Sequence, residues 1–315
     1  MSLLCRFTAA REKCRDDQRY LGGVALPGKL YLVGTPIGNL EDISLRALRV
    51  LREVDLILAE DTRRTRGLLA HFDIHTSLTS YHQHNEKSMA EKALVWLAEG
   101  CKLALVTDAG MPGISDPGEH LLQQALMKKV PVEVIPGPTA FALALVISGL
   151  PADRFTFWGF PPRQGKERQE LLVAALSRQE TSVFYEAPTR ISRTLTDLAA
   201  IAPERPAAVA RELTKIHEEV TRGSLLELAQ VFGERETKGE ICLVVAGRSP
   251  EEKEISLGSD SPPPDPVALV AQLQAEGFTR KQALRETAQR LGLSRREVYQ
   301  KVVLQKNTKD TSFRN

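Results

Sequence analysis

The sequence predicts an α/β protein with two α/β domains, followed by a small helical appendage. From Lys29 to Ile147, short apolar runs alternate with segments of helical periodicity, which is typical of a parallel sheet with helices on its faces. From about residue 151 the apolar runs follow one another without full helical crossovers, so we expect a mixed sheet with antiparallel pairs. Residues 249–265 are polar and rich in proline, which is the composition of a linker.

These changes of composition set the expected domain boundaries. Gly149-Leu150-Pro151 interrupts an apolar helix and marks the end of the first domain. The expected divisions are a disordered tail (1–28), an N-terminal α/β domain with a parallel sheet (29–150), a C-terminal α/β domain with a mixed sheet (151–248), the linker (249–265), a helical appendage resembling a helix-turn-helix (266–306) and a tail (307–315).

The first domain is expected to contain four strands and four helices. Each strand is an apolar run bounded by turn residues, and the runs are Leu30–Gly34, Val54–Ala59, Lys102–Thr107 and Val132–Ile135. The intervening helices are expected at 44–51, 85–97, 117–127 and 140–147. In the first of these, Leu45, Leu48 and Leu51 recur at helical spacing, and Asp42 or Ser44 is placed to cap its N-terminus.

The second domain and the appendage are predicted by the same patterns. The strands are expected at 155–159, 182–185, 207–211, 218–221 and 241–246, with helices from about 167 and at 189–199. The appendage is expected to form helices at 266–277, 279–292 and 294–305. Thr279 with Gln282 and Ser294 with Glu297 form two capping boxes. DNA recognition is one use of such helices; we favour a packing or RNA-contacting role.

The loops that follow the first four strands predict a binding site. They read GTPIGN, EDTR, TDAGMPGISDPG and PGPTA, and ligands of open α/β sheets bind beyond the carboxyl ends of the strands. The longest holds three glycines and two prolines, which stiffen the backbone and let a ligand approach it closely. An ordinary strand-to-helix connection is the alternative for this loop taken alone. Neither the G-x-G-x-x-G nor the G-x-x-x-x-G-K-[ST] spacing is present.

Composition limits the cell compartments in which the protein is expected and the kinds of site it is expected to contain. No apolar run approaches 18 residues, and the N-terminus lacks the apolar core of a signal peptide. The four cysteines show no C-x-x-C spacing, so Cys101 and Cys242 are expected to be buried thiols in a reducing cytoplasm. His82 and His84 have no further ligand residues at a suitable spacing, so we expect no metal site and interpret them as loop residues.

Charge is distributed unevenly along the chain. The formal net charge is +2, but residues 1–29 carry six Lys/Arg against three Asp/Glu, and residues 266–315 carry ten against four. Basic ends on an acidic body favour contact with a polyanion such as RNA. A solvated helical surface explains the charges of the appendage equally well.

Eight motifs in order resemble one known family. They are LYLVGTPIGNLEDISLRAL, AEDTR, VTDAGMPGISDPG, VIPGPTA, GLPADRFTFWGFPP, FYEAPTR, ARELTK and GEICLVV. From about Lys29 to Gly247 the chain resembles the tetrapyrrole methylases, which are S-adenosylmethionine-dependent (class III) methyltransferases. It is most similar to the branch that methylates the ribose 2′-hydroxyl of a decoding-region cytidine in 16S ribosomal RNA. The N-terminal extension and the proline-rich linker depart from the family pattern.

The resemblance implies a homodimer, no membrane attachment, and S-adenosylmethionine bound in a cleft between two α/β domains. The implied cofactor-binding residues are Thr35, Pro36, Asp108, Ala109, Gly110, Met111, Pro112, Ser115, Pro138, Thr139, Ala140, Tyr185, Ala187 and Leu213. Most of these contacts would be made by the main chain, which fits the many small residues.

Methyl transfer to a ribose hydroxyl benefits from a group that accepts its proton. Asp61, Asp116 and Glu186 are the candidates, because each follows a strand or lies in a ligand loop; capping, bracing or ion pairing is the structural alternative for each. The predicted phosphate contacts are Arg63, Arg64, Arg163, Lys166, Arg168 and Arg190. Tyr185 is a candidate for stacking on a base, and Trp158 for stacking or for the core.

Two other functions compete with RNA methylation. A small-molecule methylase acting on a tetrapyrrole precursor would share the fold and the cofactor, and would need several basic groups for the carboxylates of its substrate. A nucleic-acid-binding regulator without enzymatic activity would use the C-terminal helices and leave the loop set unexplained.

Overall fold

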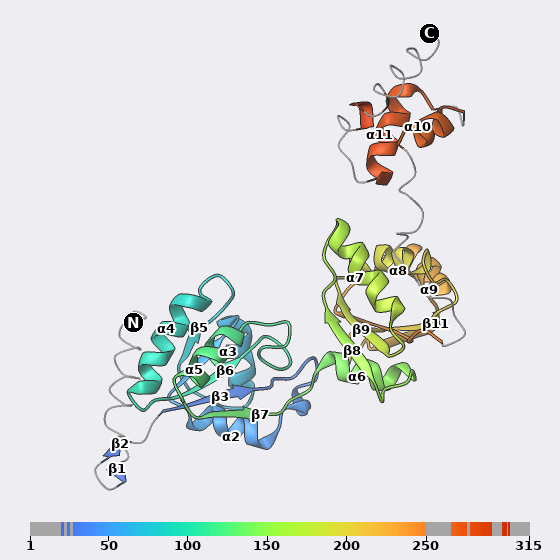
Figure 1. The fold of residues 1–315 in the computed structure, drawn as a ribbon. Helices are drawn as coiled ribbons and strands as arrows, with labels where there is room; N and C mark the ends of the chain where they lie inside the picture. The colour runs from blue at the N-terminus through green and yellow to red at the C-terminus, as the bar shows by residue number, and fades with distance from the viewer. Residues whose placement is uncertain are drawn as a thin grey trace. The chain divides into compact units, whose positions relative to one another are not determined.

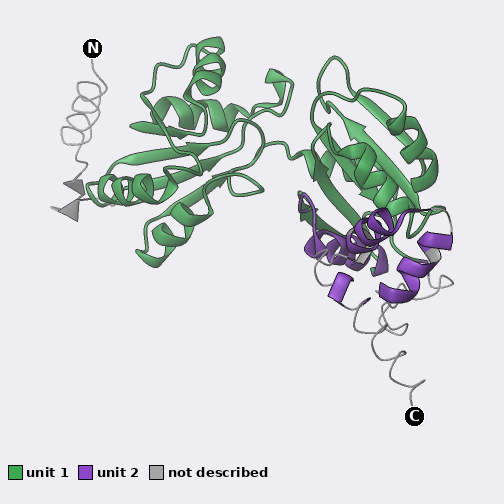
Figure 2. Cartoon of the chain, turned by 90° about the horizontal axis from the view of Figure 1, so that it is seen from above, with its two compact units in different colours: residues 1–161, 178–248 green, residues 162–177, 249–315 purple. Residues whose placement is uncertain are grey.

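The computed structural model describes residues 20–21, 24–25, 28–249, 266–275, 278–291, 298–300 and 302. The chain divides into two compact units, residues 1–161 with 178–248 and residues 162–177 with 249–315 (Figure 2). Strands β1 (Tyr20–Leu21) and β2 (Val24–Ala25) form a short antiparallel pair inside the segment expected to be disordered. The expected linker, the Ser294 capping box and the tail from 307 lie outside the described residues, apart from Ser249.

The first sheet of the first unit is entirely parallel, as predicted (Figure 1). Its strands, in the spatial order β5-β4-β6-β3-β7, are Leu78–Ser80, Leu56–Ala59, Lys102–Val106, Lys29–Val33 and Val132–Ile135. Four of them match predicted strands. The edge strand β5 was not predicted, because its three residues contain a single large apolar side chain.

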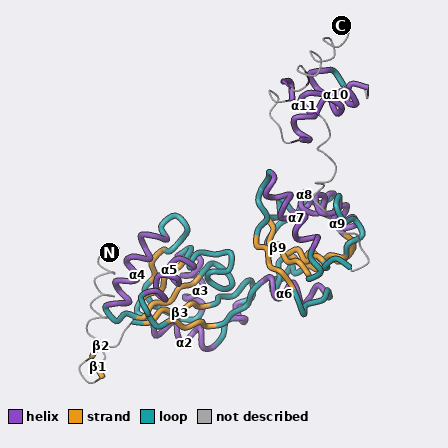
Figure 3. The backbone as a smooth tube through the Cα atoms, viewed as in Figure 1, coloured by secondary structure: helices purple, strands orange, loops and turns teal. Residues whose placement is uncertain are grey.

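Alternation along the strands sends apolar side chains to both faces of this sheet. Leu30 and Leu32 of β3 join the core that α4 (Glu86–Ala98) and α5 (Glu119–Met127) cover. Val33 and the residues on the other face pack against α2 (Leu45–Glu53) and α3 (Thr62–His71). The result is a helix–sheet–helix sandwich in which the inner strands β4 and β6 are buried on both sides. Helices and strands are distinguished by colour in Figure 3.

Local caps fix the helix starts around this sheet. The Ser44 hydroxyl accepts a hydrogen bond from the Ala47 amide at 3.1 Å, which confirms Ser44 as the cap of α2. A 3-10 turn, η1 (Leu40–Asp42), precedes it. Helix α3 was not predicted; its N-cap is Asp61, whose carboxylate accepts from the Arg63 amide.

The second sheet of the first unit is mixed, again as predicted. Its order is β11-β10-β12-β9-β8, with strands Glu219–Ser224, Pro206–Arg211, Ile241–Val245, Thr181–Glu186 and Phe155–Gly159. All neighbours are antiparallel except β8 and β9, which are parallel. Helices α8 (Ile191–Ala199) and α9 (Leu225–Gly233) pack against each other, and α9 also contacts β10 and β11.

Helix α6 (Ala140–Ser148) belongs to the second sheet by its contacts, although the sequence analysis assigned it to the first domain. It packs against β9, β10, β11 and β12, and its Ala144 and Leu145 share a core with Val183 and Val244. Because α6 is apolar almost all round, periodicity gave no sign of which sheet it would cover. In packing terms the chain therefore leaves the first sheet at β7, before the boundary expected near residue 150.

The second unit contains three described helices, α7 (Lys166–Ser177), α10 (Pro266–Ala275) and α11 (Arg280–Leu291). Helices α10 and α11 share a small core that includes Leu273 and Ala283. Thr279 and Gln282 form the predicted capping box, with hydrogen bonds of 3.0 Å and 3.4 Å between the side chains and the backbone amides. Among the helices that the structure describes, none has the length and apolar character needed to cross a bilayer.

Candidate active site

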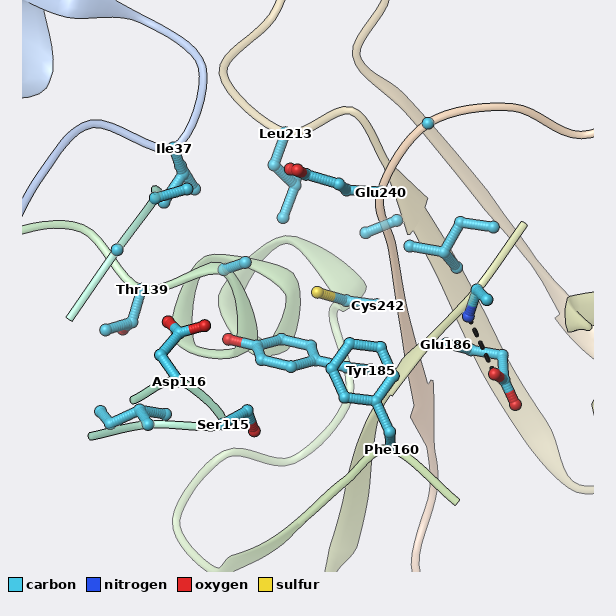
Figure 4. Close-up of a pocket in the computed structure, with 18 of the residues that line it drawn as sticks. Ile37, Ser115, Asp116, Thr139, Phe160, Tyr185, Glu186, Leu213, Glu240 and Cys242 are labelled. Carbon is cyan, nitrogen blue, oxygen red and sulfur yellow. Dashed lines mark hydrogen bonds between the residues drawn. The ribbon is translucent and has the colours of Figure 1, made fainter. Parts of the chain in front are cut away.

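A cavity of about 280 Å³ lies within the first unit, beyond the loops that follow β6 and β7 (Figure 4). Loops that follow strands of the first sheet contribute to it, as do strands of the second sheet. The lining residues from the part of the chain before residue 150 are Ile37, Ala109, Gly110, Met111, Ile114, Ser115, Asp116, Thr139 and Ala140. The lining residues from the part after residue 150 are Phe160, Tyr185, Glu186, Ala187, Pro188, Ala210, Leu213, Gly239, Glu240, Ile241 and Cys242.

The wall formed by the loop after β6 is held by backbone contacts. Thr35 and Gly110 form an isolated antiparallel bridge, with N···O distances of 2.9 Å and 3.1 Å. The Thr35 hydroxyl also donates to the Thr107 carbonyl at 3.2 Å. Gly110 has φ +81°, a conformation that glycine adopts without steric cost. The bridge therefore fixes where the loop turns into the cavity, while Thr35 itself is 2% exposed and does not line it.

Asp116 is the acidic side chain of this wall. Burial raises the pKa of its carboxyl to about 7, and the nearby carboxylates of Glu60, Asp108 and Glu240 act in the same direction. A hydrogen bond with Thr107 opposes the rise. Ser115, its neighbour, has φ +61°, which is strained for a residue with a Cβ. A carboxyl with a pKa near neutrality exchanges protons readily at physiological pH.

Aromatic and sulfur-bearing side chains face Asp116 across the cavity (Figure 4). The Tyr185 hydroxyl accepts a hydrogen bond from the Phe141 amide at 3.3 Å, and burial raises the pKa of this phenol. Phe160 lies against Tyr185, with ring centroids 5.5 Å apart. Burial also raises the pKa of the free Cys242 thiol to about 12, so this cysteine is protonated and unreactive at neutral pH.

Glu186 lines the cavity, but its carboxylate is bound to the protein. It accepts from the Ala187 amide at 2.8 Å and from the Thr194 hydroxyl at 2.6 Å, and it pairs with Arg190 at 3.1 Å. Figure 4 shows it on the far side of Tyr185 from Asp116. These contacts favour the structural alternative for Glu186 over a role as the proton acceptor.

Asp61 does not line the cavity. Its carboxylate caps α3 and pairs with the Arg63 guanidinium at 2.8 Å, and these hydrogen bonds hold the pKa of Asp61 far below its usual range. A carboxylate with so low a pKa is a very weak base, so the structure also argues against Asp61 as the proton acceptor. Of the three candidates, Asp116 alone combines a place in the cavity with a pKa near neutrality.

Asp108 connects two of the strand-end loops. Its carboxylate accepts from the Asp61 amide at 3.0 Å and pairs with Arg64 at 3.4 Å, while its own amide donates to Glu60 at 3.2 Å. These contacts tie the loop after β4 to the loop after β6. Asp108 therefore has a bracing role and no direct place in the cavity.

The residues implied for the cofactor fall into two groups. Those that line the cavity are Ala109, Gly110, Met111, Ser115, Thr139, Ala140, Tyr185, Ala187 and Leu213. Those that do not line it are Thr35, Pro36, Asp108, Pro112 and Pro138. Several lining residues were missed, among them Ile241 and Cys242 of β12, because a fully buried strand shows no sequence signal that marks one face as a site wall.

The predicted RNA contacts differ in their accessibility. Arg63 and Arg64 of α3 have side chains that are 85% and 67% exposed. Arg163 and Lys166 are exposed as well. Arg190 donates to the Pro161 carbonyl and pairs with Glu186, so its guanidinium is already engaged.

The prediction that Arg168 contacts RNA was wrong. It is 2% exposed and donates to the Pro162 carbonyl at 3.1 Å, so it is a buried structural residue that phosphates do not reach.

Two further expectations concern Trp158 and the cysteines. The Trp158 indole donates to the Ser182 hydroxyl at 3.1 Å and stacks on Phe184, which favours its packing role. Cys242 is a buried free thiol, as expected, but Cys101 is disulfide-bonded, so that part of the expectation was wrong. Within the described part of the chain no group of three or more His, Cys, Asp or Glu is arranged to hold a metal ion.

Comparisons with known proteins agree with this architecture. The family model described as tetrapyrrole (corrin/porphyrin) methylases matches residues 29–229. The protein named ribosomal RNA small subunit methyltransferase I in Halalkalibacterium halodurans is 46% identical over 274 residues, covering 86% of this chain and 93% of that relative. Its namesake in Thermotoga maritima is 47% identical over 221 residues, covering 70% and 99%.

A solved structure shares the fold. The crystal structure of uroporphyrin-III-C-methyltransferase from Thermus thermophilus aligns with a TM-score of 0.51 at 25% identity, covering 70% of this chain and 94% of that one. The two sheets, the loops that surround the cavity and the family match over residues 29–229 lead to one assignment. The chain belongs to the tetrapyrrole (corrin/porphyrin) methylase family, and within it to the branch of the ribosomal RNA small subunit methyltransferase I proteins.

Proposed function

We propose that this protein uses S-adenosylmethionine to methylate the ribose 2′-hydroxyl of a decoding-region cytidine in 16S ribosomal RNA. The names of its relatives support a methyltransferase acting on small-subunit ribosomal RNA. The observation that carries the proposal is the cavity itself. It combines walls of small residues, two aromatic rings and one carboxyl with a pKa near 7, and these are groups that suit a sulfonium donor and a weakly acidic hydroxyl.

The lining of the cavity fits the donor. Ala109, Gly110, Ala140 and Gly239 leave backbone groups accessible to the polar parts of an adenosine, and the rings of Tyr185 and Phe160 offer faces for stacking. No lysine, arginine or histidine is among the described lining residues, so no side-chain cation repels a sulfonium. When bound, S-adenosylmethionine supplies an electrophilic methyl carbon, and its sulfur keeps the electron pair of the C–S bond that breaks.

The chain contributes proton transfer and positioning. In the proposed reaction the Asp116 carboxylate accepts the proton of the ribose hydroxyl as the hydroxyl oxygen forms the new C–O bond, and the proton then passes to water. The Thr35–Gly110 bridge and the Asp108 contacts hold the loop that carries Asp116. Such fixed alignment of reacting groups lowers a barrier by about 7–11 kcal/mol in favourable cases.

The substrate and assembly parts of the proposal rest on the family and on charge. The exposed Arg63 and Arg64 are proposed phosphate contacts near the loop after β4. A nucleotide must leave its stack to reach an enclosed site, so we propose that the target is extruded. We also propose a homodimer that works in the cytoplasm, both as expectations from the family.

The alternative of a tetrapyrrole-precursor methylase is disfavoured by the same lining. A substrate with several carboxylates calls for converging basic groups, whereas the charged side chains among the described lining residues are Asp116, Glu186 and Glu240. A binding protein without activity leaves the shifted pKa of Asp116 without a role.

The test is a methyl-transfer assay with labelled S-adenosylmethionine. The protein is incubated with assembled small subunits or with naked 16S RNA, and the modified nucleotide is mapped. We expect one ribose methyl group on one decoding-region cytidine. Donor binding without transfer to either RNA substrate, together with transfer to a small tetrapyrrole precursor, would overturn the proposed substrate and leave the methyltransferase assignment in place.

A further inference from the structure

A second cavity, of about 290 Å³, lies beside the loop that carries Asp116. It lies entirely within the first unit and shares Ser115 and Asp116 with the first cavity. Its remaining lining residues come from the loop before α4, from α4 itself, from the same strand-end loop and from α5: Gln83, Glu86, Gly113, Pro117, Glu119, His120 and Gln123. Two cavities, each large enough for part of a small ligand, therefore meet at one titratable side chain.

The shared wall is short and stiff. Ser115 has φ +61°, Gly113 has φ +83°, and Pro117 restricts the backbone on the far side of Asp116. The Ser115 hydroxyl lies 3.5 Å from the position that a Cβ on Gly159 would take, so the loop tip approaches β8 closely. Asp116 lines both cavities, so its carboxyl is accessible to a ligand in either of them.

Three carboxyl side chains line the second cavity, Glu86, Asp116 and Glu119, and hydrogen bonds hold Glu86 and Glu119 in place. Glu86 accepts from the Gly118 amide and from the Tyr81 hydroxyl, both at 3.1 Å, which anchors the start of α5. Glu119 accepts from the Gln123 amide nitrogen at 2.9 Å. No lysine or arginine is among the described residues that line this cavity, and the basic side chain that lines it is His120. Such a lining repels phosphates and carboxylates, and it attracts a neutral ring that carries amino donors.

We propose that the second cavity receives the extruded acceptor nucleoside. Its base, one that carries an exocyclic amino group, lies against Glu119 and Gln123, and its ribose hydroxyl lies at Asp116. The flanking phosphates stay outside the acidic lining. This inference rests on the proposed function and adds to it the place of the acceptor: the donor lies in the first cavity, the acceptor in the second, and the hydroxyl oxygen meets the methyl carbon beside Asp116, which lines both.

Filling the second cavity tests this assignment. In Gln123→Trp and, separately, Gln83→Trp, a large side chain is introduced from α5 or from the loop before α4, at exposed positions that do not line the first cavity. Met127→Trp is the matched control, because Met127 is 76% exposed, lies on the same helix as Gln123 and lines neither cavity. Donor affinity is measured by calorimetry, and methyl transfer to small subunits is measured at saturating donor.

We expect each cavity-filling variant to lower kcat/KM for the RNA substrate by about tenfold or more, mostly through KM, while the donor Kd stays within about twofold of wild type. Met127→Trp should match wild type in both. Wild-type kcat/KM in either filled variant, with an unchanged melting temperature, overturns the acceptor site and leaves the proposed function standing. Loss of donor binding in both filled variants also overturns it, since the two cavities would then act as one. An inactive wild-type protein overturns the proposed function instead.

Discussion

At Asp116, burial and three neighbouring carboxylates raise the pKa to about 7, well above the usual range of an aspartate. Only the ionised form accepts a proton, so methyl transfer by the wild-type protein should rise with pH through about 7 and level off above it. The measurement is single-turnover transfer between pH 5.5 and 9 at saturating donor and RNA. A rate that is flat across this range, in a protein that stays folded, would remove Asp116 from the proposed role.

The control for this prediction is Asp116→Asn, which keeps the shape of the side chain and removes the base. We expect the rate to fall about 100-fold and the dependence on pH near 7 to disappear. The same shift in pKa affects stability. The folded protein binds a proton at Asp116 between about pH 4 and 7 that the unfolded chain has released, so the contribution of this group falls as pH rises through that window. The Asn variant should therefore gain melting temperature relative to wild type above pH 7.

Glu186 differs from Asp116 because its carboxylate is hydrogen-bonded and ion-paired to neighbouring residues. Glu186→Ala should remove the hydrogen bonds to Ala187 and Thr194 and leave Arg190 without its carboxylate partner. Breaking a buried ion pair from one side costs about 3–5 kcal/mol of unfolding free energy. Urea denaturation measures this loss. A stable variant that has lost methyl transfer would instead restore Glu186 as a catalytic residue.

Single residues were predictable from sequence where their chemistry is local. The loop from Asp108 to Gly118 could be singled out because its glycines and prolines lie together in the sequence. The burial of Arg168 and the engagement of Glu186 depend on contacts with Pro162 and Thr194, which only the fold brings close. Charge alone does not tell a surface arginine from a buried one.

Among the structural elements, β3 ends in a close approach of two backbones. A Cβ on Gly34 would lie 2.6 Å from the Gly137 nitrogen, whereas a Cβ on Gly67 in α3 would meet nothing within 4 Å. Gly34→Ala should therefore destabilise the protein by about 1–3 kcal/mol through overpacking. Gly67→Ala, the matched control, should stabilise it by about 0.5–1 kcal/mol through helix propensity. Thermal unfolding of both variants checks the pair, and equal effects would contradict the predicted contact.

The elements that the sequence analysis missed are those with weak patterns. Helix α3 carries three arginines and a glycine among its ten residues, so its apolar face is narrow. Helix α9 follows directly on β11, and its capping box at Ser224 and Glu227 was the signal available to find it. The longer and more regular elements, such as β3 and α4, were found to within a residue or two.

For the molecule as a whole, the basic appendage gives a prediction about RNA binding. Arg280, Lys281 and Arg285 of α11 are exposed. If they contact phosphates, replacing all three by glutamine should reduce the slope of log K against log salt by about 2 to 3. Filter binding to small-subunit RNA at several salt concentrations measures the slope. An unchanged slope would assign these charges to a solvated surface, and donor affinity should be the same in either case.

Also at the scale of the whole molecule, the presence of two sheets was predictable, but the position along the chain where packing passes from the first sheet to the second was not. Alternating strands and helices identify a parallel sheet, and their absence identifies a mixed one. Helix α6 follows a parallel strand and so was expected to cover the first sheet, yet it packs on the second. Which sheet an apolar helix covers is decided by three-dimensional packing, and its own sequence carries no trace of that choice.

Helix α6 also determines how the molecule should respond to its ligand. Its first residue lines the cavity, its middle forms the core of the second sheet, and the chain enters it directly from the first sheet. Neither half alone can therefore present a complete binding surface, and ligand occupancy opposes the local opening of both. Hydrogen exchange should slow at β6 and β12 together when S-adenosylmethionine is added. Protection limited to one sheet would mean that the halves open independently.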